Sequence, residues 1–225
     1  IEVTYVYYME TGEITGDEVI KTGTEEVTST DATFEYTIKY NAVIKNYIGN
    51  AVVTITDTLP LPIDKTKTYE LDGGVYDEES KTITWTETIE GIDTNKNGNY
   101  AVQITKSIKV SYSGLEATTR KVVNTVVGNI HTDITDKTTT PDEVETAVKV
   151  SGKVIAHYVD TNGTKLLDDI ISKDLVGNTY LTSEKEIAGY ELVKVEGETT
   201  GLYTKEDIEV TYVYYMETGE ITGDE

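Results

Sequence analysis

Three polar side chains fall among apolar neighbours in stretches with β-type alternation, and their types could support chemistry if they were buried together. They are Lys21 in VIKTG (19–23), Asp57 in VTITDTLP (53–60) and Asn124 in KVVNTVVGNI (121–130). Each shares the phase of apolar residues two positions away, so it faces the core if those residues do. Burying an unpaired carboxylate is costly, and burial favours the neutral forms of both a lysine amine and a carboxylic acid. Because a neutral amine is a nucleophile, the sequence allows a buried site in which these three groups react.

Each of the three assignments has an alternative. Asp57 comes shortly before Pro60 and could instead cap a turn. Lys106 shares the phase of the apolar residues Val102, Ile104 and Ile108, so it is a second candidate for the amine unless a β-bulge turns it outward. Apolar residues also occupy the positions that alternate with Asn124, which leaves its phase open. The alternation therefore favours a buried cluster and leaves two candidates for its amine.

The surrounding sequence indicates that these residues lie on strands. The chain has 17 tyrosines against one phenylalanine and one tryptophan, and it is rich in threonine and valine, which is typical of pleated sheets. Period-two runs continue from Val19 to about Gly128, and a polar tract at 132–146 interrupts them. A second set of strands follows and ends with IEVTYVYY (208–215). We therefore predict an all-β chain with a β-sandwich at 19–149 and a smaller domain at 150–215.

The same amino-acid sequence occurs at the beginning and at the end of the chain. Residues 1–18 and 208–225 both have the sequence IEVTYVYYMETGEITGDE, at a spacing of 208 minus 1, or 207 residues. This period is too long for a solenoid repeat and is large enough for independent domains, so we expect a window from a tandem array. In this interpretation 1–18 is the last strand of the preceding repeat plus a linker (9–18). Residues 208–215 are then the resident strand of the second domain, and 216–225 is the linker to the next repeat.

Composition excludes several classes of partner and site. With 19 basic and 41 acidic residues the net charge is −22, which argues against nucleic acid and against anionic membranes, and no apolar run is long enough to insert into a bilayer. The absence of cysteine excludes disulfides and thiolate zinc sites.

The segment DTNKNGN (93–99) is similar to the first half of a calcium loop, but Ile104 stands where the closing glutamate should be. A hairpin loop is therefore favoured over a metal site there. The isolated His131 and His157 do not indicate catalysis, and no cofactor is expected.

The second segment resembles a known family. The stretches GKVIAHYVDTNGTKLL, GNTY, EIAGYELV and GLYTKEDIEVTYVYY are similar, in order and spacing, to the MucBP (mucin-binding protein) domain of Gram-positive surface proteins. The resemblance covers roughly residues 150–215. It implies a β-grasp-like fold and a surface-protein module more firmly than it implies a ligand.

The first segment resembles the Ig-like repeat domains of the same adhesins, which are related to the A-type domains of collagen-binding adhesins. The residues that carry this resemblance are VIKTG, FEYTIKY, VTITDTLP, ITWTETI and KVVNTVVGNI. Many such domains form a spontaneous isopeptide bond between a first-strand lysine and a last-strand asparagine, assisted by an acidic residue. The resemblance then implies Lys21 as the amine, Asn124 as the carboxamide and Asp57 as the acid.

Together these features predict a non-enzymatic structural repeat from the stalk of a cell-wall-anchored adhesin, exposed outside a Gram-positive bacterium. Its only reaction would be the single-turnover formation of its own Lys–Asn bond. Its partners would be the neighbouring repeats of the same chain. The alternative function is a ligand-binding module in which the MucBP domain contacts mucin or another host or matrix glycoprotein.

Overall fold

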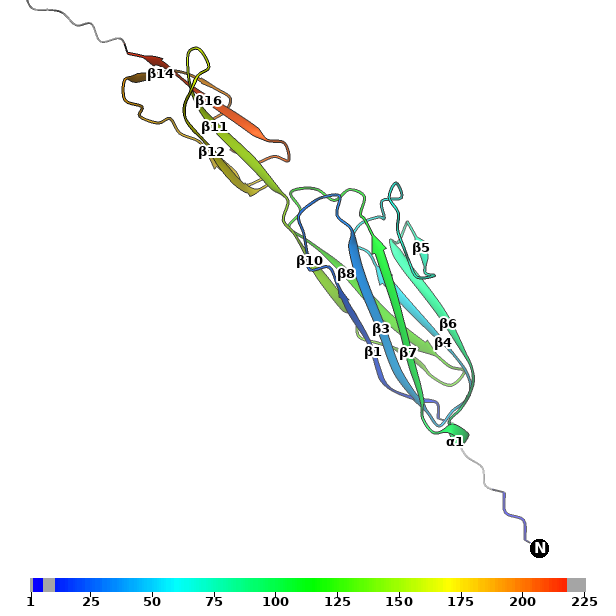
Figure 1. Ribbon diagram of the computed structural model, residues 1–225. Helices are drawn as coiled ribbons and strands as arrows, with labels where there is room; N and C mark the ends of the chain where they lie inside the picture. Colours follow the sequence, from blue (N-terminus) through cyan, green and yellow to red (C-terminus); the bar gives the residue numbers. More distant parts are fainter. Residues whose placement is uncertain (1, 6–10, 218–225) are drawn as a thin grey trace, which may run out of the picture. The chain divides into compact units, whose positions relative to one another are not determined.

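A computed structural model describes residues 2–5 and 11–217 of the chain. The chain divides into two compact units, Ile1–Val148 and Lys149–Glu225. Both consist of β-strands, and the described residues contain one short helical turn, α1 (Thr94–Asn97) (Figure 1). This confirms the predicted all-β fold, an Ig-like sandwich followed by a smaller β-grasp-like unit.

The first unit is a sandwich of two sheets. One sheet is antiparallel and has the order β1 (Glu13–Gly23), β3 (Phe34–Lys45), β7 (Tyr100–Val110). The other has the order β2 (Glu26–Val27), β10 (Asp142–Val148), β8 (Lys121–His131), β4 (Ile48–Thr58), β6 (Thr82–Asp93), β5 (Val75–Asp77), with β9 (Asp136–Thr138) paired to β8. Figure 1 shows the two sheets as separate layers. The core lies between them, because alternate residues of the facing strands are buried.

Strand β3 shows how the sequence specifies this core. Its residues alternate between buried and partly or fully exposed positions from Phe34 to Lys45, as the period-two pattern of FEYTIKY predicts. Phe34, Ile38 and Tyr40 have no exposed surface. One face of β3 therefore packs entirely into the sandwich interior, and the residues of the facing strands must meet it there.

The second unit contains a four-stranded sheet with the order β12 (Lys165–Leu175), β11 (Ser151–Asp160), β16 (Ile208–Met216), β14 (Tyr190–Glu196). Its first and last strands, β11 and β16, are parallel neighbours at the centre, as in a β-grasp fold. Strands β13 (Thr179–Leu181) and β15 (Thr200–Leu202) form a small second sheet. A set of buried tyrosines fills the core: Tyr158, Tyr180, Tyr203, Tyr212 and Tyr214. Because β16 pairs with both β11 and β14, the prediction that 208–215 is the resident strand is confirmed.

The predicted linker at 9–18 is wrong in its second half. Strand β1 begins at Glu13, which pairs with Lys45, and Ile14 is buried against the sandwich. A β-bulge between Thr15 and Glu18 hides the alternation of this stretch. Residues 2–5, which we expected to be part of a strand from the preceding repeat, are exposed and outside any strand, and the rest of 1–10 lies outside the described residues. Met216 ends β16, and most of the predicted linker at 216–225 likewise lies outside the described residues.

Candidate functional site

The structure brings Lys21, Asp57 and Asn124 into the interior of the sandwich. They come from three strands, β1, β4 and β8, and their exposed fractions are 5%, 0% and 0%. The Lys21 ammonium nitrogen, Nζ, donates a hydrogen bond to Asp57 Oδ2. A lysine and an aspartate whose side chains are both fully buried therefore contact each other beside a buried asparagine.

Strand pairing explains this meeting. In the pairing of β4 with β8, Asp57 lies opposite Val126, so Asn124 is its diagonal neighbour on the same face of the sheet. Lys21 belongs to the other sheet, where it lies opposite Ile38 of β3. Its backbone N–H donates to Asp142 Oδ2 at 2.6 Å, and Asp142 lies on β10, the strand next to β8. This hydrogen bond holds β1 against the second sheet at the position of the lysine.

The polar atoms of Asn124 are the unusual feature of the cluster. Its Oδ1 and Nδ2 atoms are both buried and make no hydrogen bond within the structure, and Asp57 Oδ1 is in the same condition. Leaving a buried polar group unsatisfied costs ~1–3 kcal/mol, so native proteins seldom retain several in one place. Burial raises the pKa of Asp57, and the Asn124 carboxamide lies close enough to that carboxyl group to oppose the shift. Asp57 thus has an amine and a carboxamide as neighbours.

Burial sets the protonation of the pair. Desolvation lowers the pKa of Lys21 from 10.5 to about 8, although the charges of Asp57 and Asp142 oppose the shift. Desolvation likewise raises the pKa of Asp57, against the effect of Lys21. Both shifts favour the neutral amine and the neutral acid. The lowered pKa increases the fraction of Lys21 that carries the neutral, nucleophilic amine near neutral pH.

Three residues that the sequence did not single out complete the site: Tyr36, Tyr112 and Gly23. The Tyr36 ring lies over the amine, with its centroid 4.9 Å from Lys21 Nζ, and its hydroxyl is 3.2 Å from that of Tyr112. Tyr36 lies opposite Gly23 in the pairing of β1 with β3. A Cβ atom at Gly23 would collide with this ring and would lie 2.6 Å from Glu35 O. Gly23 is therefore the residue that lets Tyr36 cover the lysine. In the sequence, a glycine two positions after a strand lysine was the signal that could have indicated this close packing.

The competing candidates lie elsewhere. Lys106 on β7 donates to Glu87 Oε1 at 2.6 Å, so it pairs across the open edge of the sandwich and not with Asp57. Asp57 lies within β4, paired on both sides, and does not occupy the turn before Pro60. Of the two amines that alternation allowed, the structure therefore places Lys21 in the cluster.

The segment 93–99 forms a loop around α1. Asp93 caps the helical turn, with Oδ1 accepting from the Lys96 N–H at 3.0 Å, and Thr94 is buried and hydrogen-bonded to the Tyr47 backbone.

His157 lies 3.2 Å from Asp169 in the second unit, and His131 lies 3.9 Å from Asp136 in the first. Within the described residues, no three His, Cys, Asp or Glu side chains are grouped as a metal site would require. Nor does any described helix have the length and apolar character needed to cross a membrane.

Comparison with known proteins gives one family match. Residues 153–215, which span β11 to β16 of the second unit, match the MucBP domain. Internalin J of Listeria monocytogenes strain EGD-e is 34% identical over 143 residues, and Internalin J of strain F2365 is 33% identical over 143 residues. The match covers 64% of this chain in both cases but only 13% and 12% of the two relatives, so the chain spans a small part of their length.

Among solved structures, the major pilin SpaD of Corynebacterium diphtheriae is 12% identical, with a TM-score of 0.41 over 89% of this chain and 68% of that one. A Mobiluncus mulieris adhesin described as containing intramolecular disulfide, isopeptide and ester cross-links is 11% identical, with a TM-score of 0.42 over 90% and 99%.

The family match and the fold agree on the organisation of the chain. The β-grasp-like second unit coincides with the MucBP match, and an Ig-like sandwich precedes it. The second unit therefore contains a MucBP domain, and an Ig-like β-sandwich precedes it in the chain.

Proposed function

We propose that the chain is a non-enzymatic stalk repeat of a cell-wall-anchored adhesin, and that its Ig-like domain is stabilised by a self-formed amide bond between Lys21 and Asn124. One observation carries this proposal: the buried contact between Lys21 and Asp57 lies beside a buried carboxamide without hydrogen bonds. An ordinary core would not retain these three groups, because replacing them by apolar residues of similar volume costs little or stabilises.

The reaction follows from the positions of the groups. Neutral Lys21 attacks the side-chain carbonyl carbon of Asn124 through Nζ, while protonated Asp57 donates a hydrogen bond to the carboxamide oxygen and polarises that carbon. Asp57 then takes the proton lost by the amine and delivers one to the departing nitrogen. A C–N bond to lysine replaces the C–N bond to the amide nitrogen, and one ammonia leaves. No oxidant or cofactor is needed.

Tyr36 has a supporting part in this scheme. Its buried ring covers the amine and excludes water, which preserves the desolvation that lowers the pKa of Lys21. Burial raises the pKa of both Tyr36 and Tyr112, so both hydroxyls remain protonated and can donate hydrogen bonds within the site.

The bond would suit a load-bearing stalk. Lys21 lies on β1, where the chain enters the sandwich, and Asn124 lies on β8, near the end of the domain. Tension would pass from β1 to β8 through the cross-link, so the segment 22–123 would carry no load and the sheets could not peel apart there. Unlike a disulfide, the bond is insensitive to reductant, which suits a chain without cysteine.

Single-molecule pulling tests the stalk function. Unfolding of an uncross-linked sandwich releases the 124 minus 21, or 103, residues that the bond would retain, which is roughly 340–370 Å of extended chain. We expect this release in Asp57→Asn and not in the unmodified chain, with Lys106→Ala behaving like the unmodified chain. Release of the full length from the unmodified chain would refute the proposal.

A second candidate function is recognition of mucin or another host glycoprotein by the MucBP domain. What supports it is a groove over β11, β14 and β16, which is lined by apolar and polar residues that include Val159, Asp160, Val193, Lys194, Thr211 and Val213. Apolar surface combined with a few polar groups is typical of binding sites. Mucin binding that is lost in Val193→Asp and kept in Val75→Asp, a substitution of an exposed valine in the sandwich, would support it. Equal binding by both variants would contradict it.

A further inference from the structure

The segment that occurs at both ends of the chain would connect one repeat to the next in a tandem array. Residues 208–225 are identical to 1–18, so Glu217 corresponds to Glu10 and position 218 corresponds to Thr11. The structure describes the first part of this segment in the MucBP unit, up to Glu217, and the second part in the sandwich, from Thr11. Combining the two views describes the connection between one repeat and the next.

On the MucBP side the chain is fixed through Glu217. Strand β16 runs to Met216, which pairs with Tyr190 of β14. The Glu217 N–H then donates to Gly189 O at 2.9 Å. The chain is therefore still hydrogen-bonded to the MucBP unit at the last residue that the structure describes there.

On the sandwich side the chain is fixed from Thr11 onward. The N–H groups of Thr11 and Gly12 donate to Asn46 O at 3.1 and 3.2 Å. Gly12 has φ of +56°, and a Cβ atom there would lie 3.1 Å from Thr135 Oγ1 and 3.2 Å from Ile134 Cβ. Glycine is thus required both by the backbone conformation and by the close packing, and β1 begins at the next residue.

We propose that each MucBP unit docks directly onto the α1 end of the sandwich in the following repeat, so that its partner is a second copy of this chain's own Ig-like domain. The residue held by Gly189 is followed immediately by the residue held by Asn46 of the next copy, and no free linker residue separates them. Neighbouring Cα atoms are about 3.8 Å apart and each hydrogen bond spans about 3 Å, so the two acceptor oxygens lie within roughly 10 Å of each other.

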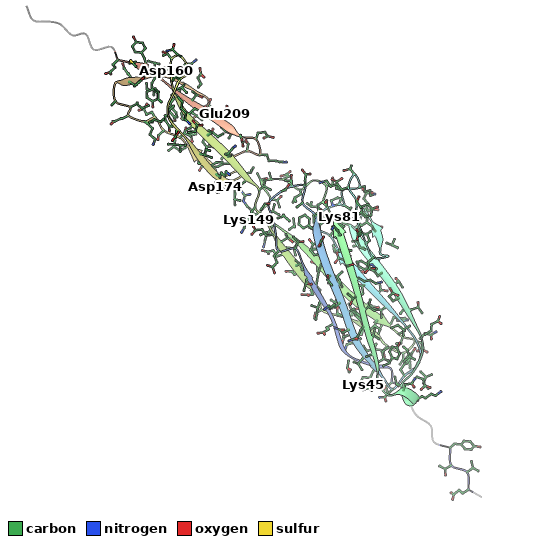
Figure 2. All side chains as sticks on the ribbon, viewed as in Figure 1. Lys45, Lys81, Lys149, Asp160, Asp174 and Glu209 are labelled. Carbon is green, nitrogen blue, oxygen red and sulfur yellow. The ribbon has the colours of Figure 1, made fainter. Side chains whose placement is uncertain are left out.

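The two ends brought together in this way both carry exposed apolar side chains. At the end of β16, Tyr215 and Met216 are 50% and 56% exposed. At the α1 end of the sandwich, Ile48, Tyr100 and Ile134 are 45%, 37% and 45% exposed. In Figure 2 the label Asp160 marks the end of β16, because Asp160 pairs with Tyr214 of that strand. The label Lys45 marks the α1 end of the sandwich, because Lys45 precedes Asn46. Exposed apolar groups at two ends that the backbone holds together bury each other on docking.

This inference does not depend on the Lys21–Asn124 bond. It replaces the short linker expected from METGEITGDE by a hydrogen-bonded joint, so each sandwich is held in a fixed orientation on the MucBP unit of the repeat before it.

The test uses two joined repeats, residues 1–207 followed by 1–225, and distances between spin labels. Because the chain has no cysteine, single cysteines can be placed at exposed sites: Asp168→Cys in the first copy and Lys39→Cys in the second. We expect a distance distribution as narrow as that of a control pair within one sandwich, Lys39→Cys with Glu79→Cys. Inserting about six Gly and Ser residues after Glu10 of the second copy, the residue equivalent to Glu217 at this joint, should broaden it several-fold. A native joint as broad as the extended joint would overturn the proposal.

Discussion

Replacing Asp57 by asparagine removes the acid that the proposed reaction needs and keeps the shape of the side chain. Asparagine can still donate a hydrogen bond, but it cannot accept the proton of Lys21 and pass it to a leaving group. We therefore expect Asp57→Asn to fold with the same β-sandwich and to remain uncross-linked. Its stability then reports what the bond contributes.

The magnitude follows from the position of the bond. It closes a loop between residues 21 and 124, and restricting an unfolded chain by a loop of about 100 residues contributes about 5 kcal/mol, by analogy with a disulfide. For a domain near 150 residues, each kcal/mol shifts the melting temperature by about 2–4 °C. The sandwich of Asp57→Asn should therefore melt about 10–20 °C below that of the unmodified chain.

Differential scanning calorimetry can measure this with an internal reference, because the MucBP unit is a compact unit of its own and lacks the substitution. Its transition should not move. Lys106→Ala is the matched control, since it removes a partly buried lysine that pairs with Glu87 outside the cluster. The reasoning is refuted if Asp57→Asn melts within about 2 °C of the unmodified chain, or if Lys106→Ala lowers the sandwich transition as much.

Two further predictions concern the same site. In Asn124→Ala, which cannot form the bond, the free energy of unfolding should rise between pH 8 and about 10. In this range the unfolded chain keeps a proton on Lys21, whose pKa is then 10.5, whereas the folded chain has lost it because the pKa of Lys21 is near 8. Urea titrations should show no such rise in the unmodified chain, whose lysine nitrogen would be an amide, and an equal rise in both would count against the bond. Gly23→Ala should displace the Tyr36 ring and slow ammonia loss at least several-fold, followed by mass during cell-free synthesis. An unchanged rate would mean that the ring does not shield the amine.

Alternation along the chain predicted the layers and most of the site, because the side chains of a strand face the core or the solvent in turn. It allowed inward positions for Lys21, Asp57 and Asn124 but left the phase of Asn124 open, and all three are buried. It could not choose between Lys21 and Lys106, since phase gives the face of a strand and not its neighbour in the opposite sheet. That choice required the pairing of β1 with β3 and the contact of Lys21 with Asp142.

The features that the sequence did not predict depend on contacts between distant residues. Tyr36 appeared as one of several core tyrosines, and only its register opposite Gly23 puts it over the amine. The start of β1 at Glu13 was hidden because a bulge interrupts the alternation among acidic residues. Such irregularities are set by packing of the folded domain, here the burial of Ile14, and local pattern carries little information about them.

Mass spectrometry of the purified chain can detect the covalent bond between Lys21 and Asn124. We expect an intact mass one ammonia below the sequence mass, and a branched peptide after proteolysis that contains both residues. The deficit should disappear in Lys21→Ala and persist in Lys106→Ala. A full sequence mass for the unmodified chain, or a branch that joins Lys106 instead of Lys21, would contradict it.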